Sequence, residues 1–566
     1  MEKKAIGIGN SIFDSRIEKG CYYVDKTLLV KDLLDSKATV TLITRPRRFG
    51  KTLNMFMLKS FFEDNTRLEY DNKSKRHLFD GLKITQAGEG YMQHFGQYPV
   101  IMMSLKGAKQ PTWEMSYSAL RGYIYDEYSR HAYLLKQGLL DDGEAVQFRQ
   151  ILDKSASQED FQIAIRLLTG YLYKYCQKKT VILIDEYDVP LESAWSNGYY
   201  IEMTGFIRSV FEAALKDNPY LEFAVMTGCL RISKESIFTG LNNPAMVSII
   251  SSRYAEHFGF TQAEVDEMLA YYGLMSKREE IREWYDGYLF GQTEVYNPWS
   301  VINRVSDLNA YIDSYPEPYW INTSGNMIIR ELVEKVVDEN VQNDLETLMA
   351  GGTIEKMINE NITYSDAYDK VDNLWNFLFF TGYLKKVGEI FINSRRHFVL
   401  AIPNIEVSTI YQDQIRAWFE RAVKTNNYTQ ALVTALVAGD IVGVQQTLSE
   451  ALMKSISYFD AAESFYHGFL TALLVSTSHY DVKSNRETGS GRSDIFLCPR
   501  TRQLPVIIIE TKIANSFDTL EAKCTEALKQ IETRRYADEF IADGYRQILK
   551  YGIAFYKKEC LLEVSH

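Results

Sequence analysis

The feature that most constrains this sequence is an apolar run that ends in a glycine–lysine–threonine loop. Residues 39–44 are apolar or β-branched, a basic loop follows at residues 45–49, and an amphipathic segment begins after Gly50-Lys51-Thr52. A strand, a loop and a helix that opens on Gly-Lys-Thr build a phosphate-binding loop, whose backbone N–H groups face the phosphates. We expect Lys51 to reach the β- and γ-phosphates and the Thr52 hydroxyl to bind Mg²⁺. The residues expected at the nucleotide are Arg48, Phe49, Gly50, Lys51, Thr52 and Leu53.

The loop departs from the usual pattern of Gly, four residues, then Gly-Lys-Ser/Thr. Arg45 stands at the first glycine position. Taken by itself, the stretch therefore has an alternative interpretation, a basic turn that happens to contain Gly-Lys-Thr.

A second motif favours the phosphate-binding loop. An apolar run at residues 181–184 ends in Asp185-Glu186. This describes a buried parallel strand that presents two carboxylates at its C-terminal end, where ligands bind in open α/β sheets. We expect Asp185 to hold the Mg²⁺ ion and Glu186 to orient or polarise the attacking water. The alternative is a pair of exposed carboxylates that cap a helix.

A third apolar run ends at Thr227-Gly228. We expect Thr227 to sense the γ-phosphate from the end of this strand. Arg231 and Lys234 follow closely, and either could meet phosphate oxygens in its own chain or in a neighbouring subunit, which leaves a homo-oligomer open. A solvated loop is the alternative for these two cations.

These motifs together resemble the predicted AAA-ATPase-like family. The resemblance rests on Tyr23–Thr27, Arg45–Leu53, Leu183–Asp188 and Thr227–Asn243, and it spans residues 5–245. It implies that Arg45 belongs to the family's own form of the loop. It also implies that the ATPase is joined to a C-terminal PD-(D/E)XK nuclease-like domain.

The middle of the chain predicts a helical lid. Thr261 is the expected N-cap of its first helix, and an aromatic block with Gly and Pro at residues 284–300 predicts a compact turn, with core packing favoured over ligand stacking. An apolar helix at residues 374–381 precedes two strand-like runs, at 391–393 and 397–402. Helix and hairpin predict a winged-helix-like module, which could bind DNA or serve as a lid.

A second acidic constellation lies near the C-terminus. Glu463 lies in an apolar helix, Asp494 opens a strand, and a buried run ends in Glu510-x-Lys512. This is the arrangement of the PD-(D/E)XK nuclease core, and Glu510 and Lys512 share a face because they lie two apart in a strand. The order looks like the Holliday-resolvase type of that superfamily. A surface ion pair is the alternative for Glu510 and Lys512.

These residues predict a metal-dependent nuclease site. We expect Asp494 and Glu510, completed by Glu463, to bind Mg²⁺ or Mn²⁺ through carboxylate oxygens. Lys512 would position the water or neutralise the transition state, and Gln530, in the following helix, is expected near the metal ligands.

We therefore predict an α/β protein in three parts. Residues 1–260 form a P-loop, AAA-like parallel sheet with helices on both faces. Residues 261–410 form the helical lid with its winged-helix-like module, and residues 411–566 form the α/β PD-(D/E)XK nuclease-like domain.

Composition narrows the class of protein. No apolar run approaches the ~18 residues that span a bilayer, the N-terminus lacks a signal core, and six scattered cysteines include no Cys-x-x-Cys pair. These features predict a cytoplasmic protein without a membrane span or a zinc site. The net charge is −11, yet residues 391–566 carry equal numbers of basic and acidic side chains.

Two functions follow from the motifs. The first is an ATP-binding and ATP-hydrolysing protein coupled to a Mg²⁺-dependent endonuclease that acts on DNA, with RNA disfavoured. The alternative is an ATP-dependent switch whose nuclease-like domain binds nucleic acid or a protein partner without cleaving it.

Overall fold

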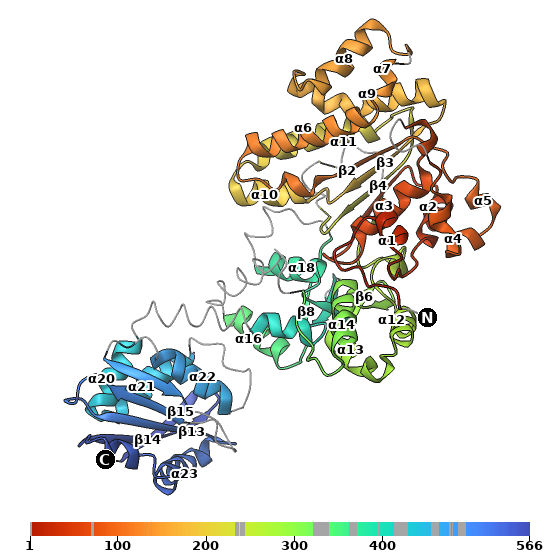
Figure 1. Cartoon of the computed structure of the whole chain (residues 1–566). Helices are drawn as coiled ribbons and strands as arrows, with labels where there is room; N and C mark the ends of the chain where they lie inside the picture. The colour runs from red at the N-terminus through yellow and green to blue at the C-terminus, as the bar shows by residue number, and fades with distance from the viewer. Residues whose placement is uncertain are drawn as a thin grey trace. The chain divides into compact units, whose positions relative to one another are not determined.

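The structure is a computed structural model. It describes residues 3–68, 73–136, 138–231, 237, 244–320, 339–360, 371–392, 395–412, 428–453, 463–474, 477, 479–484 and 494–565. The chain divides into two compact units (Figure 1), residues 1–328 with 355–407 and residues 329–354 with 408–566. The domain boundaries expected at residues 260 and 410 stay predictions.

The first unit is built on a five-stranded parallel sheet, as the sequence predicts. Its strands are β1 (Val40–Thr44), β2 (Val100–Ser104), β3 (Thr180–Asp185), β4 (Leu221–Gly228) and β5 (Ala245–Val247). The strand order is β2-β3-β4-β1-β5, and every residue of β1 and β3 is buried. Strands that are buried on both faces read as continuous apolar runs, which is why the sequence identifies them.

Helices cover both faces of this sheet (Figure 1). On one face lie α6, α9, α10 and α11, and on the other lie the first five helices, including α3, which starts at the phosphate-binding loop. Their bounds are α1 Phe13–Glu18, α2 Leu28–Ser36, α3 Lys51–Phe62, α4 Lys83–Gln86, α5 Glu89–Met92, α6 Trp113–Arg130, α7 Tyr133–Lys136, α8 Asp142–Leu152, α9 Gln158–Cys176, α10 Val189–Asn197 and α11 Tyr200–Leu215.

The strand order decides which side chains can meet. Strand β4 lies between β1 and β3, with Ile43 opposite Thr227 and Ile184 opposite Met226. The C-terminal ends of parallel strands lie at one edge of the sheet. The loop after β1, the acidic end of β3 and the polar end of β4 are therefore neighbours.

A helical segment follows the sheet. It contains α12 (Gln262–Tyr272), α13 (Arg278–Tyr285), the hairpin β6–β7 (Tyr288–Phe290 and Thr293–Val295) and α14 (Pro298–Ala310). Thr261 is the N-cap of α12 in a reciprocal capping box with Glu264, so the predicted helix start is confirmed.

The predicted helix and hairpin of the middle region are also present. Helix α18 (Val371–Thr381) precedes β9 (Lys385–Ile392) and β10 (Arg395–Ala401), which form a three-stranded sheet with β8 (Ile354–Lys356) in the order β8-β10-β9. Side chains 374–380 are each no more than 6% exposed. The stretch 374–380 of α18 is therefore buried and presents no surface to a DNA groove, which favours the lid interpretation for α18.

The second unit contains a mixed five-stranded sheet in the order β11-β12-β13-β14-β15. Strand β13 pairs antiparallel with β12 and parallel with β14. The described helices and strands of the second unit are α16 (Glu339–Met349), α20 (Tyr428–Ala438), α21 (Ile441–Met453), α22 (Glu463–Leu474), β11 (Tyr480–Ser484), β12 (Asp494–Pro499), β13 (Val506–Ile513), α23 (Leu520–Thr533), α24 (Asp538–Ala542), β14 (Ile548–Tyr556) and β15 (Glu559–Ser565). No helix within the described ranges of either unit is long and apolar enough to cross a bilayer.

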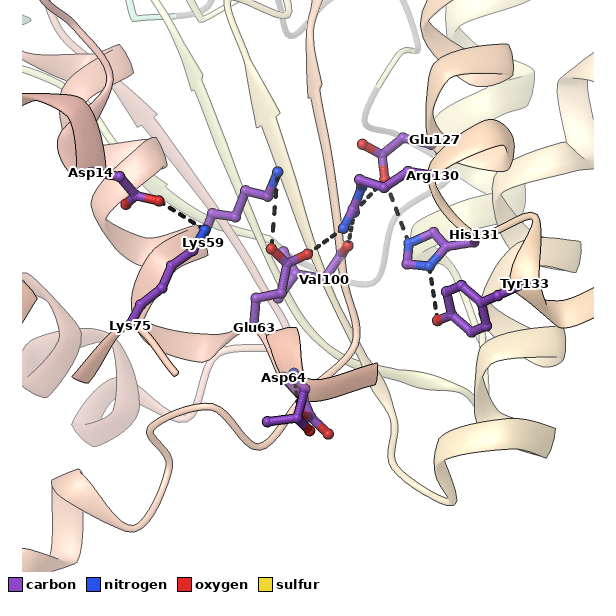
Figure 2. Close-up of polar contacts among 11 residues, drawn as sticks. Asp14, Lys59, Glu63, Asp64, Lys75, Val100, Glu127, Arg130, His131 and Tyr133 are labelled. Atoms are coloured by element: carbon purple, nitrogen blue, oxygen red, sulfur yellow. Dashed lines mark hydrogen bonds and ion pairs between the residues drawn. The ribbon is translucent and has the colours of Figure 1, made fainter. Parts of the chain in front are cut away.

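A buried charge cluster joins α3 to α6 at the end of α3 remote from the phosphate-binding loop (Figure 2). The Arg130 guanidinium donates to Glu63, Glu127 and the Val100 carbonyl. Burial and the neighbouring Arg130 charge hold the pKa of His131 well below its usual range, so this imidazole is neutral. The cluster balances its own charges and serves to fix α6 against β2 and α3.

A buried carboxyl lies where the helical segment meets the residues after β10. Glu406 is fully buried, and it accepts hydrogen bonds from the Ser300 hydroxyl at 2.9 and 2.8 Å and from the Trp320 backbone N–H at 2.9 Å. Burial raises its pKa to about 7. Its ionised form is therefore disfavoured in the folded state.

The first prediction concerns this carboxyl. The pKa of Glu406 in the folded state lies above its ordinary value of 4.5. Its contribution to the free energy of unfolding is therefore fully present below pH 4.5 and is lost as pH rises through about 7. Glu406→Gln removes this titration. Between pH 5 and pH 8 the free energy of unfolding of the variant should therefore rise by about 2.5 kcal/mol relative to that of the wild type. Thermal unfolding of both proteins across this range measures the difference. The exposed Glu283→Gln serves as control, and parallel curves for wild type and Glu406→Gln would contradict the assignment.

Candidate functional site

The loop after β1 has the backbone of a phosphate-binding loop. Gly50 is the N-cap of α3 with φ +83°, and Arg48 has φ +71°. The Lys51 ammonium donates to the carbonyl oxygens of Arg45 at 2.9 Å and Pro46 at 2.8 Å. Lys51 is thus folded over its own loop, next to the first N–H groups of the helix. These groups form an anion site.

Asp185 lies at the centre of the strand ends. Its Oδ2 accepts a hydrogen bond from the Thr52 hydroxyl at 2.8 Å, and its Oδ1 accepts one from the Thr227 hydroxyl at 2.6 Å. The structure therefore brings together three of the predicted residues, from three different segments. A hydroxyl and a carboxylate side by side are hard oxygen donors of the kind that Mg²⁺ prefers, so these residues fit the expected ion.

Glu186 follows Asp185 with a left-handed backbone, φ +54°. This conformation is costly for a residue with a Cβ atom and is typical of functional sites. Burial, and next the charge of Asp185, raise the pKa of Glu186. A carboxylate of raised pKa is a suitable proton acceptor near neutral pH.

The next two residues fix the turn after β4. Asp188, which is 3% exposed, accepts hydrogen bonds from the backbone N–H groups of Cys229 at 2.8 Å and Leu230 at 2.9 Å. The Tyr187 hydroxyl donates to the Leu230 carbonyl. Tyr187 and Asp188 therefore hold the turn after β4 in place, and we call their hydrogen bonds to this turn the clamp.

Arg231 follows this turn, and its side chain forms an ion pair away from the phosphate-binding loop. Its Nη1 lies 3.0 Å from Glu360 Oε2, in the segment before α18. Arg231 is not among the residues that line the cavity described next. Its predicted contact with phosphate stays a prediction, and Lys234 lies outside the described residues.

A cavity of about 720 Å³ opens beside the phosphate-binding loop. Residues 47–54 and Glu186 line it, so all six predicted loop residues face it. Lys106 and Lys109, which follow β2, add positive charge to its wall. No local sequence motif marks these two lysines, although their position after a strand that ends at the same sheet edge is a usable signal.

Another wall of the cavity is apolar. It combines the N-terminal segment and the stretch before α2 with Phe260 and side chains of α12 and α14. These residues are Ile6, Ile8, Tyr22, Val24, Phe260, Met268, Tyr272, Trp299 and Ile302. The guanidinium carbon of Arg48 lies 4.3 Å from the centre of the Trp299 ring, a cation–π contact. The sequence favours core packing over ligand stacking for residues 284–300, yet Trp299 faces the cavity.

Arg45, in place of the usual glycine, is fully buried under the loop. It donates to the carbonyl oxygens of Thr44, Val247 and Arg253 and lies 4.9 Å from the Phe290 ring centre. Burial lowers its pKa to about 9. Arg45 therefore supports the loop from below and does not obstruct it.

One side of the loop packs against the β6–β7 hairpin and the residues around α18. The Phe49 ring lies 4.9 Å from that of Tyr288, and an added Cβ at Gly382, just after α18, would lie 3.1 Å from Pro46 Cβ. The centre of the Trp320 ring lies 6.4 Å from that of Tyr288 and 4.7 Å from that of Tyr383. Pro46 and Phe49 are thus the loop residues that make this contact.

Two acidic residues of the second unit lie on neighbouring strands. Asp494 in β12 is the Cα partner of Glu510 in β13. Lys512 Nζ lies 3.0 Å from Glu510 Oε1, which also accepts a hydrogen bond from Gln530 Nε2 at 2.6 Å. Glu510 is fully buried. The structure therefore brings Lys512 and Gln530 to Glu510.

The metal ligand set is described only in part. The side chains of Glu463 and Asp494 lie outside the described residues, although α22 begins at Glu463 as expected. Among the side chains that are described, no group of three His, Cys, Asp or Glu residues could hold an ion. Metal binding by Glu463, Asp494 and Glu510 stays a prediction.

Comparison with known proteins identifies the families of both domains. Residues 6–238 match the model of the predicted AAA-ATPase family, and residues 461–564 match that of the PD-(D/E)XK nuclease superfamily. The chain joins an AAA-ATPase-like domain to a domain of the PD-(D/E)XK nuclease superfamily. A protein of Azotobacter chroococcum mcd 1, described as an uncharacterized protein in the vnfD 5′ region, is 26% identical over 557 residues, 96% of this chain and 95% of that relative.

The second prediction tests the clamp in the AAA-ATPase-like domain. A Cβ at Gly228 would lie 2.5 Å from the Tyr187 ring and 2.8 Å from Asp188 Oδ1. Gly228→Ala should therefore destabilise this domain by about 1–3 kcal/mol through overpacking. Gly205→Ala, in α11 with no atom within 4 Å of the new Cβ, should instead stabilise it by about 0.5–1 kcal/mol. Thermal unfolding measures both, and equal effects of the two variants would contradict the close approach.

Proposed function

We propose that the AAA-ATPase-like domain binds and hydrolyses ATP and that the nuclease-like domain cleaves DNA with the help of Mg²⁺ or Mn²⁺. The observation that carries the first part is Asp185, which joins the Thr52 and Thr227 hydroxyls at the strand ends beside a cation-lined cavity. The family matches support the same two activities.

The residues of the first site divide the work of hydrolysis. The N–H groups at the start of α3, with Lys51, Lys106 and Lys109, balance the charge of the triphosphate. Thr52 and Asp185 would hold Mg²⁺, which neutralises charge on the phosphates when bound. Glu186 accepts the proton of the attacking water, and Thr227 orients Asp185.

The apolar wall supplies the place for the nucleoside. A flat base buries apolar area between the N-terminal segment and α12, while its sugar and phosphates extend toward the loop. Ligand sites of this kind combine an apolar lining with few, well-placed polar groups.

In the nuclease-like domain, Glu510 is the central carboxylate. Asp494 and Glu463 are proposed to complete the metal shell, and Lys512 is proposed to stabilise charge on the cleaved phosphate. Gln530 orients Glu510 by its hydrogen bond at 2.6 Å.

The third prediction tests the proposed base. Glu186→Gln should lower the kcat for ATP by about 10²–10⁴-fold and leave ATP affinity unchanged, because the amide cannot accept the proton. In the wild type kcat should rise with pH through the raised pKa of Glu186, since only the ionised carboxyl acts as base. Phosphate release measures kcat, and the exposed Glu202→Gln is the control. A variant with wild-type kcat would remove Glu186 from the mechanism.

The fourth prediction tests cleavage. Wild type with ATP and Mg²⁺ or Mn²⁺ should cut plasmid DNA, and Glu510→Gln should abolish cutting, because the amide binds a divalent ion poorly. Glu532→Gln, whose carboxylate is exposed and pairs with Lys550, should cut like the wild type.

Gel analysis of the DNA after the reaction distinguishes a nuclease from an ATP-dependent switch that does not cleave. Cutting by Glu510→Gln would refute the nuclease site. A wild type that hydrolyses ATP but leaves single-stranded, duplex and branched DNA intact would favour the switch with a non-cleaving domain.

A further inference from the structure

The N-terminal segment Ile6–Ser11 lines the cavity, although it belongs to no helix or strand. A segment of this kind has no ladder of its own to hold its shape, so its conformation depends on contacts with its surroundings. Gly7 within it has φ +66°, and a Cβ there would lie 2.7 Å from Cys21 Sγ. The segment is therefore fitted closely against the chain that follows it.

Arg16 holds this segment in place. Its guanidinium donates to the carbonyl oxygens of Ile6 at 2.8 Å and Gly7 at 3.0 Å. It also donates to the carbonyl of Asn10 at 3.2 Å and, through Nε, to that of Tyr22 at 3.1 Å. One side chain in α1 thus fixes both ends of the segment and ties it to the stretch that begins at Tyr22.

The chemistry of Arg16 is unusual for a buried cation. The residue is only 6% exposed, and no acidic side chain among the described residues forms an ion pair with it. Its hydrogen bonds to four carbonyl oxygens satisfy the guanidinium, whose planar fork of donors suits several acceptors at once. A lysine has one ammonium group and cannot reach the same four atoms.

The segment held by Arg16 is part of the apolar wall. Ile6, Tyr22 and Val24 pack against the buried cluster of α12 and α14 that contains Met268 and Tyr272. The Tyr22 and Tyr272 rings lie with their centres 5.5 Å apart. The loop residues that face phosphate, from Arg47 to Asn54, come from a different part of the chain.

We propose that Arg16 is a positioning residue that shapes the nucleoside end of the cavity and sets the preference for ATP over a triphosphate without a base. The inference rests on the proposed nucleotide site. A wall that is rigid before the ligand arrives costs less ordering on binding, so its loss weakens the part of the affinity that comes from the base. The affinity for the phosphates depends on Lys51 and the start of α3, and it stays unchanged.

The test compares two ligands by calorimetry on the full chain with Mg²⁺, a non-hydrolysable ATP analogue and inorganic tripolyphosphate. Wild type should bind the analogue more tightly, and Arg16→Ala and Arg16→Lys should lower that preference by about tenfold, which corresponds to about 1.4 kcal/mol. Tripolyphosphate affinity should stay at the wild-type value in both variants.

Arg130→Lys is the matched control. Arg130 is also a largely buried arginine of the first unit that donates to a backbone carbonyl, and it does not line the cavity. This variant can lower the melting temperature but should keep the full preference for the ATP analogue. The ratio of the two affinities therefore separates positioning from general loss of stability.

Each outcome has a defined meaning. If Arg16→Lys, or Arg16→Ala where it folds, keeps the wild-type preference, or if Arg130→Lys loses it equally, the role of Arg16 is overturned. If Lys51→Ala binds both ligands like the wild type, the nucleotide site itself is wrong. A wild type that does not distinguish the analogue from tripolyphosphate overturns the nucleoside wall while leaving the phosphate site in place.

Discussion

The two hydrogen bonds that Asp185 accepts hold the first unit together at its functional edge. One comes from Thr52 at the start of α3 and the other from Thr227 at the end of β4, at 2.8 and 2.6 Å. Because β4 lies between β1 and β3 in the sheet, the loop, the acidic strand end and the polar strand end converge on one carboxylate. The clamp of Asp188 on the turn after β4 extends this arrangement by two further hydrogen bonds. A ligand at the loop therefore meets a set of groups that is already assembled, and such preorganisation is the main source of electrostatic catalysis.

Two buried arginines that pair with no carboxylate among the described residues support this edge from either side. Arg45 lies beneath the phosphate-binding loop, and Arg16 lies behind the N-terminal segment. Each is bound chiefly by backbone carbonyl oxygens. A buried charge is costly unless its hydrogen bonds are satisfied, so each arginine stabilises only the one loop conformation that supplies its acceptors. Irregular chain segments thereby gain a definite shape that regular secondary structure does not provide.

The sequence was informative where function depends on short, contiguous patterns. The loop at Gly50 and the strand ending at Asp185 follow from apolar periodicity and from residues a few positions apart. It was uninformative where distant segments meet. Lys106 and Trp299 reach the cavity through the strand order and the lid, which local patterns do not specify.

The contact between Gly382 and Pro46 has an evolutionary consequence. A side chain at Gly382 would meet the proline ring 3.1 Å away, and Gly382 itself has φ +92°. A larger residue at either place would push the lid off the loop, whereas a smaller one at the proline would leave a gap. Homologues should therefore change these two positions in concert, although 336 positions separate them in the sequence. A chimera that exchanges lids between relatives should need its phosphate-binding loop exchanged as well.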